Sequence, residues 1–154
     1  MKSTRLLLFS ALFLSLCGCS SLNKEPSLSE TYQESLVRKA IGEYELVSSR
    51  NTPYNYEYCY ITIESYNVIS SRYKIENTEE RTFKTNFSCR RFEKDYFIED
   101  NRLEVRLQKY DNYILSQGYN IVLDFDENDE NPQIKISSQG ITEKGYIIFD
   151  FAKK

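Results

Sequence analysis

The chain has 154 residues, a formal net charge of −3 and no histidine. This length suits one domain with its own core, and the acidic balance disfavours a nucleic-acid partner. Without histidine, Ser-His-Asp and Cys-His catalytic arrangements are excluded. The five glycines form neither a phosphate-binding loop nor a GxSxG motif, so we expect no enzyme and no cofactor.

The first 18 residues have the layout of a bacterial secretory signal peptide. Lys2 and Arg5 supply positive charge, an apolar run of 11 residues follows at 6–16, and small residues come next. A spanning helix needs about 20 apolar residues, so we do not expect this run to remain as a transmembrane helix. Removal of residues 1–18 leaves 18 basic against 23 acidic residues, a net charge of −5.

The end of this segment, Leu16-Cys17-Gly18-Cys19, resembles the lipobox of bacterial lipoproteins. A lipobox has an aliphatic residue three positions before the modified cysteine and a small residue directly before it. The resemblance implies cleavage before Cys19, a diacylglyceryl thioether on its sulfur and usually an acyl chain on its amine, which together anchor a protein durably. Ser20, in place of the aspartate of an inner-membrane retention signal, implies the outer membrane, facing the periplasm. An ordinary signal peptide that is cut elsewhere is the alternative.

Residues 19–27 form the expected lipidated tether, and an amphipathic helix is predicted over 28–41. Ser27 stands three residues before Glu30, which is the spacing of a capping box at a helix start. Basic residues near the end and Gly42 just after it suit the helix dipole and a C-cap. The apolar residues at helical spacing are Leu28, Tyr32, Leu36, Val37, Ala40 and Ile41.

After Gly42 the apolar spacing changes to two, and the 13 tyrosines and nine phenylalanines favour strands. Turn residues such as Glu99-Asp100-Asn101 separate the runs. We predict a mainly β fold over 28–154: an antiparallel meander forming a small barrel or strongly curved sheet of about 8–9 strands, with one N-terminal helix. The predicted strands are 43–49, 56–65, 68–76, 81–90, 95–99, 102–110, 119–125, 133–137 and 145–151.

Two further cysteines, Cys59 and Cys89, remain in the predicted domain. Strand alternation places both on apolar faces, and a lone pair of cysteines in an oxidising compartment favours a disulfide. Closing a loop of about 30 residues would stabilise the fold by about 3.5 kcal/mol on the chain-entropy model. Two buried free thiols are the alternative. We expect no zinc site, because two cysteines without histidine do not complete one.

The acidic stretch at 124–132 partly matches a calcium-binding loop. Asp124, Asp126 and Asn128 occupy the first three ligand positions of an EF-hand loop. Asp129 stands where glycine is required, however, and Lys135 where the bidentate glutamate belongs. We interpret the stretch as an acidic hairpin loop and expect no metal.

Four tyrosines at two-residue spacing form the candidate binding surface: Tyr54, Tyr56, Tyr58 and Tyr60. In an extended strand they share one face, opposite Cys59 and Ile61. Tyrosine offers a rigid apolar ring with a polar tip, which suits recognition. The alternative is that these rings pack beneath the helix or cover the outside of the sheet.

Gly42-Glu43-Tyr44 resembles the G-x-W start of lipocalin-like small barrels of bacterial lipoproteins, with tyrosine in place of tryptophan. The resemblance implies a cavity for a small ligand. Two functions follow: a non-catalytic module that binds an envelope protein or glycan, such as an inhibitor or immunity protein, or a lipocalin-like carrier of a small apolar ligand. An interior filled by Phe, Ile and Tyr favours the binding module, and an interior cavity favours the carrier.

Overall fold

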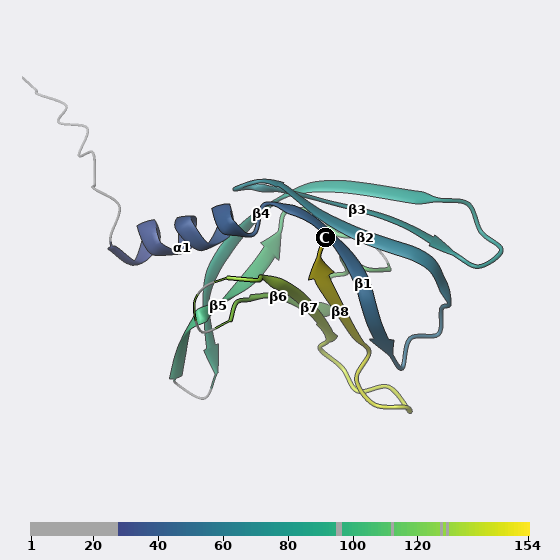
Figure 1. Cartoon of the computed structure of the whole chain (residues 1–154). Coiled ribbons are helices and arrows are strands. Elements are labelled where there is room, and N and C mark those ends of the chain that lie inside the picture. Colours follow the sequence, from purple (N-terminus) through teal and green to yellow (C-terminus); the bar gives the residue numbers. More distant parts are fainter. Residues whose placement is uncertain (1–27, 95–96, 112, 127, 129) are drawn as a thin grey trace, which may run out of the picture.

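The computed structural model describes residues 28–154 except 95, 96, 112, 127 and 129. The signal peptide, the tether and Cys19 therefore lie outside the described residues. One helix, α1 (Leu28–Lys39), precedes eight strands (Figure 1). The strands are β1 (Gly42–Arg50), β2 (Tyr56–Ser65), β3 (Val68–Ile75), β4 (Arg81–Lys94), β5 (Phe97–Leu107), β6 (Tyr119–Asp124), β7 (Gln133–Ser138) and β8 (Ile148–Lys153).

The strands form a closed antiparallel barrel in sequence order, with β8 pairing back onto β1. The predicted mainly β fold, a small antiparallel barrel with one N-terminal helix, is confirmed. Eight strands enclose an interior just wide enough for side chains to fill. No helix within the described part of the chain is long and apolar enough to cross a membrane.

The main difference from the predicted elements lies in β5, which joins the two strands predicted at 95–99 and 102–110. The predicted turn at 99–101 is wrong, because these residues belong to the strand. A register shift between Arg91 and Phe92 of β4 accommodates them. Such a bulge lets polar residues with turn propensity stay inside a strand.

The barrel interior is packed with large side chains. Every strand contributes at least one fully or nearly fully buried apolar residue. The largest fully buried side chains include Tyr44, Tyr73, Phe149, Phe151, Ile61, Ile63, Ile69, Leu103 and Ile121. These large side chains fill the interior, as expected for an eight-stranded barrel.

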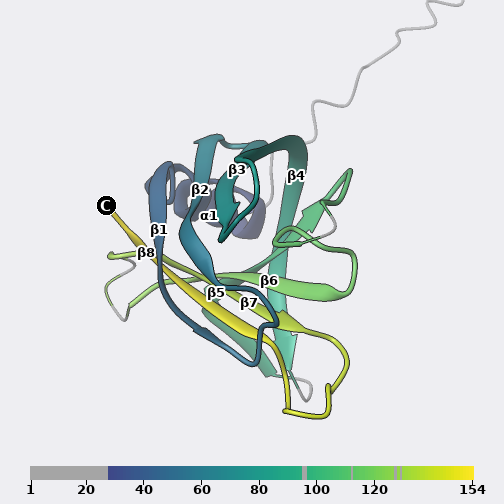
Figure 2. The same ribbon diagram turned by 90° about the vertical axis from the view of Figure 1, so that its right-hand side faces the viewer.

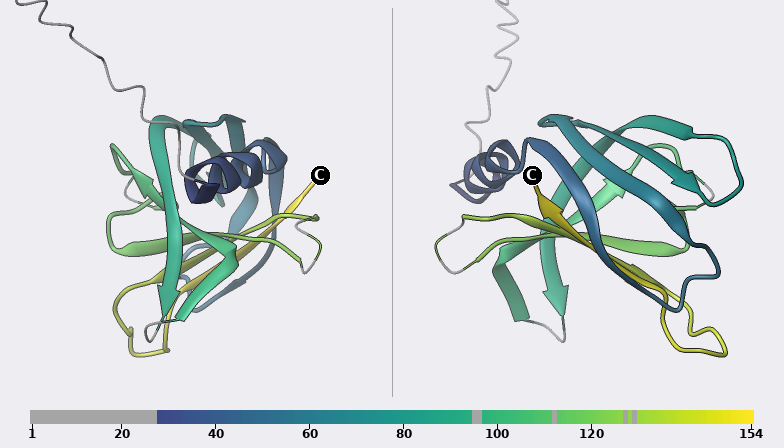
Figure 3. Two further views of the ribbon diagram at one scale, coloured as in Figure 1. Left: turned by 90° about the vertical axis from the view of Figure 1, so that its left-hand side faces the viewer. Right: turned by 45° about the vertical axis from the view of Figure 1, so that its right-hand side comes forward.

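At one end of the barrel, here called the helix end, α1 lies across the opening (Figure 2, Figure 3). Leu36, Val37 and Ala40 are buried there. The Tyr44 hydroxyl donates a hydrogen bond to the Ala40 carbonyl (2.6 Å), and Lys153 Nζ donates one to the carbonyl of Lys39 (2.8 Å). Carbonyls at the end of a helix lack partners within it, so these two bonds act as caps.

The opposite end, here called the mouth, carries the β1–β2, β3–β4, β5–β6 and β7–β8 connections. Ile114 and Leu115, from the β5–β6 connection, are fully buried there. The barrel is thus closed at both ends, by a helix at one and by a folded loop at the other.

The predicted disulfide is wrong, because Cys59 and Cys89 are both free. Cys59 pairs with Tyr73, which pairs with Arg81, whereas Cys89 lies eight residues further along β4. At about 3.3 Å per residue, Cys89 lies about 26 Å along the strand direction from Arg81, the residue level with Cys59. A disulfide needs Cα atoms within about 7 Å. Burial raises the pKa of each thiol to about 12, so both stay protonated and inert.

Candidate functional site

The four tyrosines of the predicted binding row do not share one face. Tyr56 pairs with Ile75 and Tyr58 with the adjacent Lys74, so Glu57 is an extra residue in β2. A bulge of this kind puts two residues opposite one and breaks the alternation of side chains. As a result Tyr56 packs against the core, while Tyr58 and Tyr60 lie on the outer wall. The prediction of a single tyrosine face is wrong, and the role of the row in binding stays a prediction.

Tyr56 belongs to a group of six aromatic rings at the mouth, here called the mouth cluster. Its centre is Tyr56, whose ring centroid lies 6.1 Å from that of Tyr73 and 5.9 Å from that of Phe149. The other members are Tyr54, Tyr113 and Tyr119. Edge-to-face pairs at such distances add stability beyond the area they bury.

The Tyr56 phenol is buried in this cluster without a hydrogen bond of acceptable geometry among the described residues. Burial raises its pKa, the neighbouring Cys59 adds to the rise, and the nearby Thr52 hydroxyl opposes it. The phenol is therefore neutral at physiological pH, and its hydroxyl is a polar atom inside an apolar cluster.

Tyr58 and Tyr60 lie side by side on the outer wall, with ring centroids 5.9 Å apart and ring planes tilted by 30°. The Tyr58 hydroxyl donates a hydrogen bond to Glu80. The guanidinium of Arg72 lies 5.2 Å from the Tyr60 ring centroid, and Lys154 Nζ lies 4.5 Å from it. Both rings already have intramolecular partners, so this wall offers less free aromatic surface than the sequence suggests.

Of the seven exposed large hydrophobic residues in the described part of the chain, four lie on the mouth connections. Tyr54, Tyr110, Ile141 and Tyr146 are 39%, 45%, 70% and 47% exposed and come from three different connections. We call these four residues the mouth surface. Sequence reasoning identified only Tyr54, as the first member of the alternating tyrosine row, because the other three residues belong to no such row.

The connections that carry the mouth surface are held by hydrogen bonds. Asn51 Nδ2 donates to the carbonyl of Tyr146 (2.8 Å), which ties the β1–β2 and β7–β8 connections together. Thr142 and Gly145 exchange two backbone hydrogen bonds of 3.0 Å. Gly145 has φ +105°, a conformation that other residues rarely adopt. The mouth surface is thus carried on connections fixed to the barrel, a common arrangement for binding residues.

A polar hollow of about 630 Å³, the mouth notch, opens beside this surface between the β3–β4 connection and residues 110–111. The Tyr73 hydroxyl donates to both carboxylate oxygens of Asp111 (3.2 Å each). The N–H of Tyr113 donates to Asp111 Oδ1 (3.2 Å), and the Arg81 guanidinium lies 4.7 Å from the Tyr113 ring centroid. Burial raises the pKa of Tyr73 and Asp111 adds to the rise, so the phenol stays a neutral donor.

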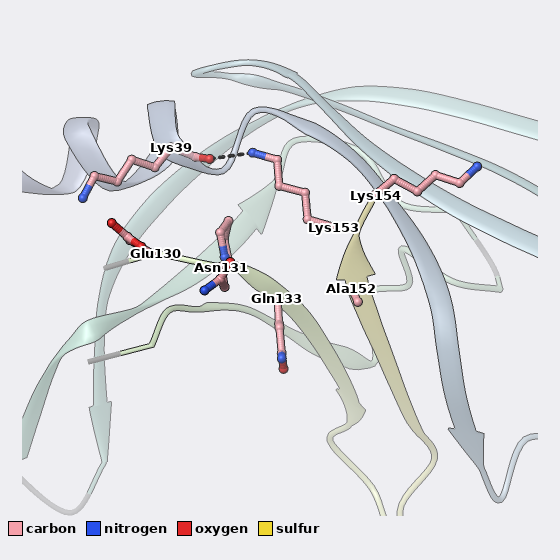
Figure 4. A pocket seen from close by; sticks show the side chains of 8 residues that line it. Lys39, Glu130, Asn131, Gln133, Ala152, Lys153 and Lys154 are labelled. Carbon is pink, nitrogen blue, oxygen red and sulfur yellow. Dashed lines mark hydrogen bonds between the residues drawn. The ribbon is translucent and has the colours of Figure 1, made fainter. Parts of the chain in front are cut away.

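A second hollow, of about 550 Å³, lies at the helix end between α1, the β6–β7 connection and the C-terminus (Figure 4). Lys39, Lys153 and Lys154 contribute to its walls. Lys153 caps α1, and Lys154 Nζ lies 3.2 Å from Glu43 Oε1 and over the Tyr60 ring. Lys153 and Lys154 thus already have intramolecular partners, so this hollow offers little free positive charge to an anion.

Within the acidic stretch at 124–132, Asp124 is the last residue of β6, and the Asp126 side chain forms several local hydrogen bonds. Asp126 Oδ1 accepts from the N–H groups of Asn128 (3.1 Å) and Glu130 (2.7 Å). These bonds hold the pKa of Asp126 below its usual range. Among the residues described, no three Asp, Glu or Cys side chains converge as ligands for a metal ion.

No protein-family model, curated protein or solved structure matches this chain.

Proposed function

We propose that this chain is a bacterial envelope lipoprotein, anchored through Cys19, that acts as a non-catalytic binding module for an envelope protein or glycan. The observation that carries the proposal is the contrast between a filled interior and exposed large side chains on fixed mouth connections. An exposed aromatic and aliphatic patch on a rigid support is typical of an interaction surface.

The position of the predicted anchor relative to the mouth surface supports this proposal. The lipobox cysteine stands nine residues before Leu28, so the tether reaches at most about 30 Å. Because α1 closes the helix end, the mouth surface lies at the other end of the barrel from the predicted anchor. An anchored barrel would then present this surface away from the lipid, where a periplasmic partner can reach it.

The lipocalin-like carrier receives less support. A carrier of an apolar ligand needs an interior cavity, whereas Tyr44, Tyr73, Phe149 and Phe151 fill this barrel. The hollows at the mouth and at the helix end both open to solvent and have mainly polar side chains in their walls.

Crosslinking of the lipidated protein in its own envelope tests the binding role. The mouth variant Ile141→Ser/Tyr146→Ser should reduce the specific crosslinked partner roughly tenfold, as loss of central contact residues does. The matched control Val47→Ser/Tyr66→Ser removes side chains of comparable exposure away from the mouth and should leave capture unchanged. Equal capture by both variants would contradict the proposal for the mouth surface.

The anchor is tested separately. Mass spectrometry of the membrane form should find an acylated N-terminal Cys19, and Cys19→Ala should release the protein or stall its processing. A soluble wild-type product that begins at another residue would rule out the anchor.

A further inference from the structure

The mouth notch has walls of mixed chemistry. Its side chains include three carboxylates, Glu79, Glu80 and Asp111, and one guanidinium, Arg81. Hydroxyl groups come from threonines of the β3–β4 hairpin and from Tyr73, which lies at the buried base. Tyr110 forms part of one wall and is 45% exposed. Donors, acceptors and an aromatic ring therefore converge on one concave site.

Asp111 is held in place and keeps capacity for a ligand. A carboxylate has about four acceptor sites. Among the described residues, the donors to Asp111 are the Tyr73 hydroxyl, which is shared between both oxygens, and the N–H of Tyr113. Within the described part of the chain, the second oxygen, Oδ2, receives only the shared bond. A donor arriving in the notch would meet a carboxylate that is already oriented, which reduces the entropy lost on binding.

Charge decides which class of ligand fits. Three carboxylates against one guanidinium give the walls a net charge of −2, which disfavours an anionic ligand. The Arg81 guanidinium, fixed over the Tyr113 ring, opposes a cation at the same place. A neutral ligand rich in hydroxyl groups both donates to carboxylates and accepts from guanidinium and hydroxyl groups, and its C–H faces can lie against Tyr110.

We infer that the mouth notch is a binding site for a neutral saccharide. This inference rests on the proposed binding module and names a ligand class for it. It does not depend on the lipid anchor or on capture of a protein by the mouth surface, so its failure would leave both of those tests unaffected.

The test uses the mature full-length protein in detergent micelles, followed by NMR during titration with maltotriose and with triacetylchitotriose. At least one trisaccharide should give saturable amide shifts at residues 78–82 and 110–111, with a dissociation constant on the order of 1–10 mM. Tyr110→Ala should weaken this binding about tenfold, and Glu79→Gln should weaken it as well. Both positions are exposed, so these variants should fold.

Matched controls are Tyr66→Ala and Glu143→Gln, which change the same residue types on other exposed parts of the chain. Both should bind like the wild type. Absence of saturable shifts with either sugar up to about 20 mM, or equal binding by Tyr110→Ala, would overturn the inference. Binding of trilysine at the same residues in place of both sugars would also overturn it and would identify a site for basic side chains.

Discussion

The two ends of the barrel are closed in different ways. At the helix end, apolar residues of α1 pack into the opening, and Tyr44 and Lys153 cap the carbonyls at the end of the helix. At the mouth, an irregular loop and a cluster of aromatic rings fill the opening, and the Tyr56 hydroxyl lacks a hydrogen bond of acceptable geometry among the described residues.

This difference separates a structural role from a binding role. At the helix end, the carbonyls of Lys39 and Ala40 both receive a side-chain donor, as buried polar groups in stable folds generally do. At the mouth, the buried Tyr56 hydroxyl has no hydrogen bond of acceptable geometry among the described residues, and four large side chains are exposed. Departures from local rules of this kind concentrate at functional sites, which is why the binding proposals concern the mouth.

The largest change in stability is expected for Tyr56→Ser, and Tyr58→Ser at the next position of the tyrosine row is its comparison. Tyr56→Ser removes a ring packed against Tyr73 and Phe149 and should lower the free energy of unfolding by about 3 kcal/mol. Tyr58→Ser, on the outer wall, should lower it by about 1 kcal/mol or less. Urea denaturation of the single variants measures both values. Equal losses would show that Glu57 does not mark a bulge in solution.

Much of the architecture could be predicted from the sequence. The helix was predicted over 28–41 and is observed over Leu28–Lys39, because capping, dipole and periodicity all act within one short segment. The meander was predictable because alternating runs with polar connections between them favour antiparallel neighbours. Both predictions use information that lies within a few residues along the chain.

The site was less predictable, because it depends on register. Alternation correctly placed Cys59 inside but could not give its level along the barrel relative to Cys89, and so predicted a disulfide that the strand pairing excludes. The bulge at Glu57 is also a matter of pairing with β3 and moves Tyr56 to the other face. The buried role of Ile114 and Leu115 in a loop has no periodic signal at all.

A smaller effect is expected at the helix end from Tyr44→Phe. The change keeps the buried ring but leaves the carbonyl of Ala40 without the donor at 2.6 Å. An unsatisfied buried acceptor costs about 1–3 kcal/mol, which thermal and urea unfolding would detect. Tyr66→Phe, at an exposed tyrosine, is the control and should have no effect. If Tyr44→Phe were equally neutral, the cap would have no importance for the helix end.

The acid sensitivity of the barrel should depend in part on Asp124, whose side chain is 15% exposed. Burial by itself raises the pKa of Asp124, but hydrogen bonds from Arg102 and Lys135 more than offset it, so the pKa lies below its usual value. The stabilisation is therefore present above about pH 4 and is lost as the pH falls through the lowered pKa.

Asp124→Asn should reduce the loss of stability between about pH 5 and pH 2 by on the order of 1 kcal/mol. Denaturation curves recorded at several pH values measure this difference. Glu143→Gln changes an exposed acid in the β7–β8 connection and should leave the pH profile as in the wild type. An Asp124→Asn profile that matches the wild type would mean that another group causes the acid sensitivity.

The smallest change in stability is expected for Tyr56→Phe, which is the same chemical change as Tyr44→Phe at the opposite end of the barrel. Tyr56→Phe removes a hydroxyl that is buried in the mouth cluster and, within the described part of the chain, has no hydrogen bond of acceptable geometry. Deleting it relieves the desolvation of a polar group and keeps the ring contacts with Tyr73 and Phe149, so stability should stay unchanged or rise by up to about 1 kcal/mol. The same chemical change would then destabilise the helix end and not the mouth. A loss of 1 kcal/mol or more in Tyr56→Phe would show that this hydroxyl has a partner in solution, such as an ordered water, and that the two tyrosine hydroxyls do not differ in this respect.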